Sequence, residues 1–206
     1  MQIRALSVAG AFEITPRQFP DDRGVFLESF RGDRLGEVIG HRMEVAQTNV
    51  SVSSRGTLRG IHFADVPVGQ AKYITALTGA LIDFVVDLRV GSPTFGRWDS
   101  VLLDAADRRA VYLAEGLGHA FVALEDGTTA HYLCSSAYSP TAEHGIHPLD
   151  PAVGLALPDG LEPILSPKDT AAPSLEEAVA SGLLPTHEAC TAFYTQLASG
   201  AGRSAR

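Results

Sequence analysis

The chain has 206 residues, of which 45% are hydrophobic, and carries a formal net charge of −8 at pH 7. Its length supports one domain with a substantial core, and its acidic balance argues against a duplex nucleic acid partner, which normally needs a basic face. No apolar run approaches the roughly 18 residues that span a bilayer, and the N-terminus lacks an apolar core of signal-peptide type. We therefore expect a cytoplasmic protein with no membrane partner.

Short apolar segments separated by Gly, Pro, Asp and Asn dominate residues 1–135, which predicts β-strands. The expected strands, in chain order, cover residues 24–30, 44–53, 57–63, 71–79, 80–91, 98–104, 108–116, 119–127 and 128–136. In the strand that contains "LRGIHF", alternation places Arg59 and His62 on opposite faces. Many short strands at this spacing predict an all-β antiparallel sandwich or barrel.

Helix signals are confined to a few places. Residues 33–40 predict one short helix, and residues 174–182 a clearer one, in which Ser174 and Glu177 form a capping-box pattern. A second C-terminal helix is expected over residues 187–197, followed by a disordered tail, "SGAGRSAR". We therefore predict a single domain over residues 1–185, with a helical extension and flexible tail over residues 186–206.

Polar residues interrupt most of the predicted strands. They are Gln47, Asn49, Arg59, His62, Lys72, Asp83, His119 and Tyr132. Polar groups that face the interior of a sandwich are costly unless they have partners. Eight such positions are too many for a dry core, so the pattern predicts a polar pocket inside the fold.

Each position also has a purely structural interpretation. A single strand histidine is more often structural than catalytic, and Lys72 could extend outward from a strand edge. Asp83 and Asp87 could lie on the solvent face of an edge strand, and Tyr132 could be an ordinary core residue. The two cysteines, Cys134 and Cys190, form no CxxC pattern, so we expect reduced structural thiols.

Metal binding is the less favoured interpretation of the histidines. His131, His144 and His147 lie close together in the sequence, but they form no H-x-H or H-x-x-x-H pattern on a single element. Glu143 and His144 could equally belong to a surface loop. No GxGxxG or Walker sequence occurs in the chain.

The remaining polar set is suited to proton transfer. A neutral histidine is a general base near pH 7, a lysine can stabilise a developing oxyanion, and a tyrosine can deliver a proton from the opposite wall. Together these groups fit proton abstraction next to a carbonyl, followed by reprotonation. The arginines indicate an anionic substrate group such as phosphate.

Several motifs together resemble one known family. "DDRGVFLESF", "VAQTNVSVSSRGTLRGIHF", "GQAKY", "DLRVGSPTFGRW", "EGLGHAF", "AYSPTAEHGIHPLDP" and "LSPKD" occur in this order. The chain thereby resembles the dTDP-4-dehydrorhamnose 3,5-epimerase family over roughly residues 1–185. The resemblance implies a cupin-type jelly roll with short C-terminal helices, a homodimer, a dTDP-4-keto-6-deoxyhexose substrate, and no metal or other cofactor.

The resemblance also implies residue roles. His62 would be the base, Asp169 would orient it, Lys72 would stabilise the enolate, and Tyr132 would be the acid. The residues implied to hold nucleotide, diphosphate or sugar are Arg23, Phe26, Glu28, Gln47, Asn49, Arg59, His119, Tyr138, Glu143 and Lys168, with Tyr138 stacking on thymine. Asp169, Arg23 and Tyr138 come from the resemblance alone.

This chain departs from the usual family motifs around the pocket. Phe63 and Ala64 replace Tyr and Gln, Ala137 replaces the first residue of a Tyr-Tyr pair, Ala120 replaces a glycine, and "HPLDP" replaces "WNDP". These changes resemble the branch that makes modified sugars for bacterial antibiotics, some members of which invert carbon 3 or carbon 5 alone. The sequence therefore does not decide whether one or both centres are inverted. Two other classes of protein remain as alternatives: a metal-dependent cupin enzyme and a non-catalytic nucleotide-sugar-binding jelly roll.

Overall fold

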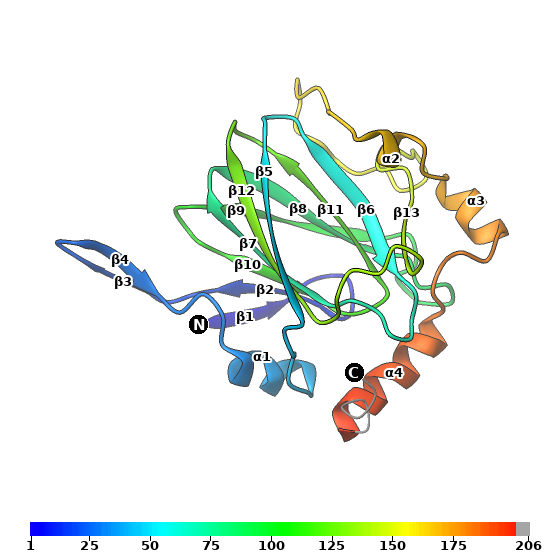
Figure 1. Ribbon diagram of the computed structural model, residues 1–206, viewed down its shortest axis with the longest axis horizontal. Coiled ribbons are helices and arrows are strands. Elements are labelled where there is room, and N and C mark those ends of the chain that lie inside the picture. The colour runs from blue at the N-terminus through cyan, green and yellow to red at the C-terminus, as the bar shows by residue number, and fades with distance from the viewer. Residues whose placement is uncertain (201–206) are drawn as a thin grey trace.

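Two antiparallel β-sheets face each other in the computed structural model, which describes residues 1–200 (Figure 1). One sheet has the strand order β1 (Gln2–Ala5), β2 (Ala11–Thr15), β10 (Ala110–Leu113), β7 (Lys72–Thr78), β12 (Thr128–Cys134) and β5 (Gln47–Ser53). The other has the order β13 (Glu143–Gly145), β6 (Leu58–Ala64), β11 (Leu117–Ala123), β8 (Ala80–Asp87) and β9 (Trp98–Asp104). The arrangement confirms the predicted jelly roll.

The remaining elements lie around this sandwich. They are the hairpin strands β3 (Gln18–Asp21) and β4 (Gly24–Leu27) and the helices α1 (Gly32–Ile39), α2 (Pro167–Thr170), α3 (Leu175–Ala180) and α4 (His187–Ser199). The three C-terminal helices follow the prediction of helices late in the chain. Residues 201–206 of the expected disordered tail lie outside the described residues. No helix within residues 1–200 is long and apolar enough to cross a membrane.

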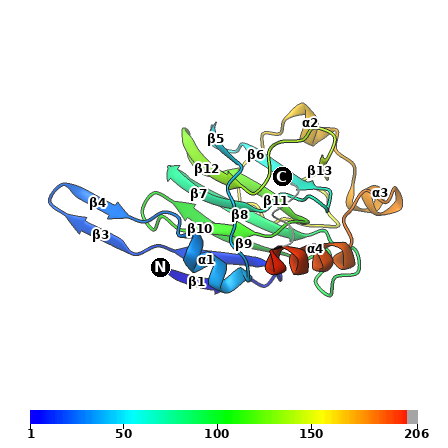
Figure 2. The ribbon, with the colours of Figure 1, turned by 60° about the horizontal axis from the view of Figure 1, so that its bottom comes forward.

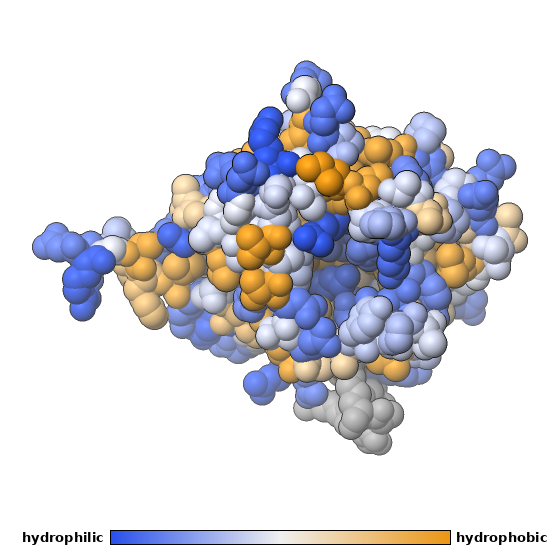
Figure 3. Space-filling view, turned by 45° about the horizontal axis from the view of Figure 1, so that its top comes forward, coloured by the Kyte–Doolittle hydropathy of each residue, from blue (hydrophilic) through white to orange (hydrophobic). Residues whose placement is uncertain are grey.

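The hairpin of β3 and β4 stands out from the sandwich in both ribbon views (Figures 1 and 2). Strand β4 ends at Leu27, and α1 begins at Gly32. The strand is thus shorter than the one expected over residues 24–30. Figure 3 shows hydrophobic side chains where the hairpin leaves the body and hydrophilic ones at its tip. Phe19, Val25 and Phe26 are the exposed apolar residues of these strands.

The five-stranded sheet is buried on both faces, which explains the near-continuous apolar run of β8. Leu81 and Val85 belong to the core between the two sheets, whereas Phe84 and Val86 belong to a second apolar layer behind this sheet. Ile146 and other residues of the segment that leads to α3 contribute to that layer. A strand enclosed on both sides needs apolar residues at consecutive positions.

Burial also settles the position of the two aspartates of β8. Asp83 and Asp87 are both fully buried, so the alternative that placed them on the solvent face of an edge strand is wrong. Asp87 accepts a hydrogen bond from Arg89 Nη2 at 2.8 Å, and others from Ser92 and Thr94. Burial acts to raise the pKa of Asp87, but these donors outweigh it and lower the pKa to about 2.

A β-bulge interrupts the pairing of β6 with β11. His62 pairs with His119, but Arg59 pairs with Phe121, so β6 carries one extra residue between the two pairs. Gly60 lies at this point, with a φ of 130°. A Cβ atom on Gly60 would lie 2.5 Å from the Cβ of Ala120. The prediction that Arg59 and His62 face opposite sides is therefore wrong, because the bulge turns both toward the interior between the sheets.

Gly60→Ala tests the importance of this bulge. We expect it to lower the free energy of unfolding by at least about 3 kcal/mol, because a left-handed backbone and overpacking combine there. Gly127→Ala is the matched control, since Gly127 also has a positive φ but no atom within 4 Å of its built Cβ; it should cost about 1 kcal/mol. Urea unfolding measures both, and equal losses would show that close packing at Gly60 is unimportant.

Candidate active site

A cavity of about 250 Å³ opens between the two sheets. It is lined by Gln47, Asn49, Arg59, His62, Gln70, Lys72, His119, Phe121, Tyr132, Cys134, Tyr138, Glu143, Ser166, Lys168 and Asp169. All of the polar strand residues singled out from the sequence line it except Asp83, which lies behind His119. The structure thus brings together most of the predicted site in one concave and polar space, the usual form of a ligand site.

His62 and Asp169 form an acid–base pair at one wall of the cavity. The His62 Nε2 lies 2.7 Å from Asp169 Oδ1, and the His62 side chain is 32% exposed. Burial acts to raise the pKa of Asp169, but its contact with His62 and the hydrogen bonds that it accepts outweigh burial and lower the pKa. An ionised carboxylate at this place can orient the ring and stabilise the charge that forms when His62 accepts a proton from substrate.

The local sequence explains how Asp169 reaches His62. Ser166 caps α2, its Oγ accepting a hydrogen bond from the Asp169 backbone N–H at 3.1 Å, and Pro167 occupies the first turn. This one-turn helix contacts β6. The cap therefore places the Asp169 carboxylate, which is almost completely buried, against the imidazole.

A second histidine–carboxylate pair lies deeper. The His119 Nε2 is 2.7 Å from Asp83 Oδ2, and both side chains are buried. The other oxygen, Asp83 Oδ1, has no hydrogen-bond partner among the described residues. The His119 ring packs edge-on against Tyr132, with a centroid distance of 6.3 Å. This pair therefore supports the cavity floor and holds the tyrosine ring.

Lys72 and Tyr132 project into the cavity from the six-stranded sheet. Burial lowers the pKa of Lys72, while the neighbouring Cys134, Glu143 and Asp83 act in the opposite direction. Burial also raises the pKa of Tyr132, which favours the protonated phenol at neutral pH. Because His62 belongs to the five-stranded sheet, the base and this phenol stand on facing walls of one cavity.

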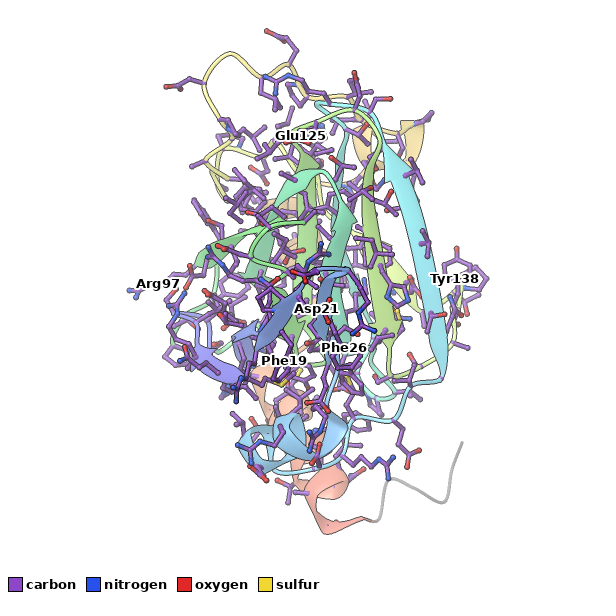
Figure 4. The ribbon with its side chains drawn as sticks, turned by 90° about the vertical axis from the view of Figure 1, so that its left-hand side faces the viewer. Phe19, Asp21, Phe26, Arg97, Glu125 and Tyr138 are labelled. Carbon is purple, nitrogen blue, oxygen red and sulfur yellow. The ribbon has the colours of Figure 1, made fainter. Side chains whose placement is uncertain are left out.

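The remaining predicted binding residues of the cavity form a polar rim. Gln47 donates to Asn49 Oδ1 at 2.8 Å and accepts from the Tyr138 backbone N–H at 2.8 Å. The Tyr138 side chain is exposed and lies at the outer side of β5 in Figure 4. Arg59 donates to Ser53 Oγ at 3.2 Å, and Glu143 accepts from Gln70 at 3.3 Å. Lys168 completes the set on α2.

Three of the predicted binding residues lie outside this cavity. Arg23 and Phe26 belong to the projecting hairpin, where Arg23 Nη2 lies 2.6 Å from Asp21 Oδ2 and the Phe26 ring packs against Phe19. Figure 4 shows Phe26 and Asp21 on the hairpin, apart from Tyr138. Glu28 follows the hairpin and pairs with Arg31 at 3.0 Å. These three residues do not line the cavity.

The structure also adds four lining residues that the sequence interpretation missed. Gln70, Phe121 and Cys134 lie on or beside predicted strands, and nothing in their local pattern distinguishes them from core or surface residues. Ser166 had a usable signal, since Ser-Pro at the start of a helix is typical of an N-cap.

The three histidines considered as metal ligands are His131, His144 and His147. Of these, His144 contacts Asp65 at 3.0 Å. Residues 1–200 contain no cluster of three or more potential metal ligands.

Known protein sequences match nearly the whole of this chain. The family model described as dTDP-4-dehydrorhamnose 3,5-epimerase matches residues 5–177. A dTDP-4-dehydrorhamnose 3,5-epimerase of Mycolicibacterium smegmatis is 54% identical over 96% of this chain and 97% of its own length. A dTDP-4-dehydrorhamnose 3-epimerase of Streptomyces niveus is 54% identical over 93% of this chain and 92% of its own.

A solved structure shows the same fold. ChmJ, a 3'-monoepimerase from Streptomyces bikiniensis in complex with dTDP-quinovose, superposes with a TM-score of 0.92 at 49% identity, covering 94% of this chain and 98% of that chain. Both the family match and these identities extend over nearly the whole of the jelly roll. The chain belongs to the dTDP-4-dehydrorhamnose 3,5-epimerase family.

Proposed function

We propose that this protein epimerises a dTDP-4-keto-6-deoxyhexose at carbon 3, carbon 5 or both, in deoxysugar biosynthesis. The observation that carries the proposal is the placement of the His62–Asp169 pair and Tyr132 on facing walls of one cavity, with Lys72 beside them. Relatives named as 3,5-epimerases and as 3-epimerases support the reaction class. The bound dTDP-quinovose of ChmJ supports a dTDP-sugar as ligand.

The first half of the reaction is proton removal. The carbonyl at carbon 4 acidifies the hydrogens on carbons 3 and 5, and His62 takes one of them from its own face of the sugar. The C–H electron pair enters the new C=C bond, and the negative charge moves to oxygen 4, where the Lys72 ammonium stabilises it. The Asp169 carboxylate stabilises the imidazolium that forms.

The second half is proton return to the opposite face. Tyr132 gives its phenolic proton to the enolate carbon, so that the C–H bond forms from the side away from His62 and the carbonyl at carbon 4 is restored. The charge passes to the tyrosine oxygen. The cycle closes when solvent returns a proton to Tyr132 and accepts the substrate proton from the His62 imidazolium. Inversion results because the two groups stand on different sheets.

Substitutions at His62 and Asp169 test the base. His62→Ala should lower deuterium exchange from D₂O into the substrate by about 10²- to 10⁴-fold, the usual contribution of a general base. Asp169→Asn should cause a smaller loss, because the amide can still hydrogen-bond the ring but carries no charge. Proton NMR in D₂O with dTDP-4-keto-6-deoxyglucose measures exchange at each carbon. Unchanged dTDP affinity serves as the control for folding, and wild-type exchange in His62→Ala would contradict the assignment.

Tyr132→Phe tests the acid, because it removes the hydroxyl and keeps the ring packed against His119. His62 should still form the enolate, and solvent deuterium should still enter by return to the same face. Epimer formation should therefore fall much more than exchange in the same NMR experiment. An equal fall in both rates would show that Tyr132 positions the sugar, and no fall in either would show that another group is the acid. The carbons that exchange also reveal which centres this pocket inverts.

We also propose a homodimer in which the β3–β4 hairpin of one protomer reaches the cavity of its partner. Three observations support this arrangement: the hairpin projects from the body, Phe26 is 67% exposed, and Arg23 is exposed to solvent in its ion pair with Asp21. An exposed apolar surface of this kind is typical of an interaction site. Arg23 would then add a cation for the diphosphate beside Arg59 and Lys168, despite the net acidic charge of the chain.

Mixing two variants with different defects tests this arrangement. Arg23→Ala should weaken dTDP binding and raise the Michaelis constant, whereas His62→Ala should lose turnover. If the hairpin acts on the partner's site, mixed dimers contain one intact site, so equal mixing after dissociation should restore roughly a quarter of wild-type activity at low substrate. Failure to regain activity, although mixed dimers form, would place Arg23 in its own protomer's function. A monomer in sedimentation at micromolar concentration would refute the dimer.

The alternatives from other classes have direct tests. A metal-dependent cupin enzyme predicts stoichiometric bound metal in elemental analysis of the purified protein, together with loss of activity on chelation. A non-catalytic binding protein predicts dTDP-sugar affinity without exchange of substrate hydrogens. The assignment of residues 1–185 to one domain with a helical extension, and the cytoplasmic location, stay predictions.

A further inference from the structure

A hydroxyl behind the proposed acid has no assigned role. Ser51 lies on β5, two residues beyond Asn49, and faces inward with it, while Val50 and Val52 between them are exposed on the other side. Its Oγ lies 2.6 Å from the Tyr132 hydroxyl oxygen. Among the described residues, Ser51 is not part of the cavity lining. It contacts the Tyr132 hydroxyl from the neighbouring strand.

The Tyr132 ring is already held by other groups. His119 packs edge-on against it, and Phe121 packs at 6.3 Å on a tilted plane. These contacts fix the ring but leave the torsion of the phenolic O–H undetermined. The contact with Ser51 is therefore the one that acts on the proton itself.

The direction of this hydrogen bond decides whether Tyr132 can act. A phenol has one proton and can also accept hydrogen bonds, as can a serine hydroxyl. If Tyr132 donates to Ser51, its proton points away from the substrate. If Ser51 donates to Tyr132, the phenolic proton is free to point into the cavity, and the tyrosine oxygen already has a donor when it becomes negative.

We propose that Ser51 is a positioning residue for proton delivery: it donates its hydroxyl proton to the Tyr132 oxygen, directs the phenolic proton toward the enolate carbon, and stabilises the tyrosinate formed by the transfer. This inference rests on the proposed function, with Tyr132 as the acid. The bond strengthens as charge develops on the oxygen, because a hydrogen bond to an ionised group is stronger than a neutral one. Ser51 therefore stabilises the transition state more than the ground state.

The other charged and titratable groups around Tyr132 do not replace this donor. Arg59 acts to lower the pKa of Tyr132, whereas Asp83 and Cys134 act to raise it. His119 meets the ring through its edge and is engaged with Asp83 through Nε2. Burial is the largest influence and opposes the tyrosinate, and the Ser51 hydrogen bond is first among the groups that favour it.

The kinetic test is a double-mutant cycle, followed by NMR in D₂O with dTDP-4-keto-6-deoxyglucose. Ser51→Ala should lower epimer formation by about 10- to 100-fold, the range for loss of a hydrogen bond to a charged group, and should leave exchange catalysed by His62 nearly unchanged. Ser51→Thr, which keeps the hydroxyl, should restore most of the loss. Ser51→Ala should have no further effect in a Tyr132→Phe background. Ser54→Ala, at an exposed serine just beyond β5, is the matched control.

Three outcomes of these kinetic measurements would overturn the role of Ser51. If the effects of Ser51→Ala and Tyr132→Phe multiply, or if Ser51→Ala lowers exchange and epimerisation together, Ser51 has a packing role independent of the tyrosine proton. Wild-type epimer formation in Ser51→Ala would likewise refute it.

A second measurement needs no turnover and separates this inference from the proposed function. The chain has five tyrosines, and ¹³C NMR of Cζ-labelled tyrosine, assigned with Tyr132→Phe, follows the titration of Tyr132 alone. Loss of Ser51 removes a donor to the tyrosinate, so the pKa of Tyr132 should rise in Ser51→Ala and return in Ser51→Thr. An unchanged titration would overturn the role of Ser51 even in an active enzyme. A wild-type protein that neither exchanges nor epimerises this substrate would count against the proposed function, while the titration would still decide the inference.

Discussion

Gly60 lies at the bulge that turns Arg59 and His62 to the same side of β6, and its backbone passes so close to Ala120 that a side chain would not fit there. In a regular strand, two residues three positions apart face opposite ways. One of these two groups would then lie in the apolar layer behind the five-stranded sheet, among residues such as Phe84. Burying an unpaired ionic group in such a place costs several kcal/mol. That cost is about as large as the whole free energy of unfolding of a small domain. The proposed base and a cation therefore share one cavity because a glycine permits an irregular strand.

The two histidine–carboxylate pairs show how exposure separates groups of the same chemistry. Both hydrogen bonds are 2.7 Å long, but the His62 side chain is 32% exposed and the His119 side chain 7%. Both rings line the cavity, but the His62 ring is the more accessible of the two and is therefore better placed to exchange a proton with substrate. The deeper pair is suited instead to holding neighbouring rings in place. The two histidine–carboxylate pairs thus differ in the roles they suit because they lie at different depths within the sandwich.

Much of the fold followed from the sequence, because strand alternation and turn residues are local signals. The polar residues of the strands also identified most of the cavity, since polar groups inside a sandwich are costly unless they have hydrogen-bond partners. The bulge at Gly60 could not be predicted, because it depends on contact with a strand some sixty residues later in the chain. Asp169 reached the site through a short capped helix, and only the family resemblance pointed to it. The same resemblance named Arg23 and Phe26, but it could not show that they stand on a projecting hairpin.

Strand β5 presents two different surfaces at alternate residues. Gln47, Asn49 and Ser51 face the interior between the sheets, whereas Val50 and Val52 are exposed on the outer face at an edge of the sheet. Because side chains alternate strictly along a strand, a shift of one residue in its pairing with β12 would exchange the two surfaces. The valines would fill the cavity, and the amides and hydroxyl would face outward. An error in folding at this edge would therefore abolish the site and change the outer surface at once, so a β5 paired out of register cannot produce a partly working enzyme.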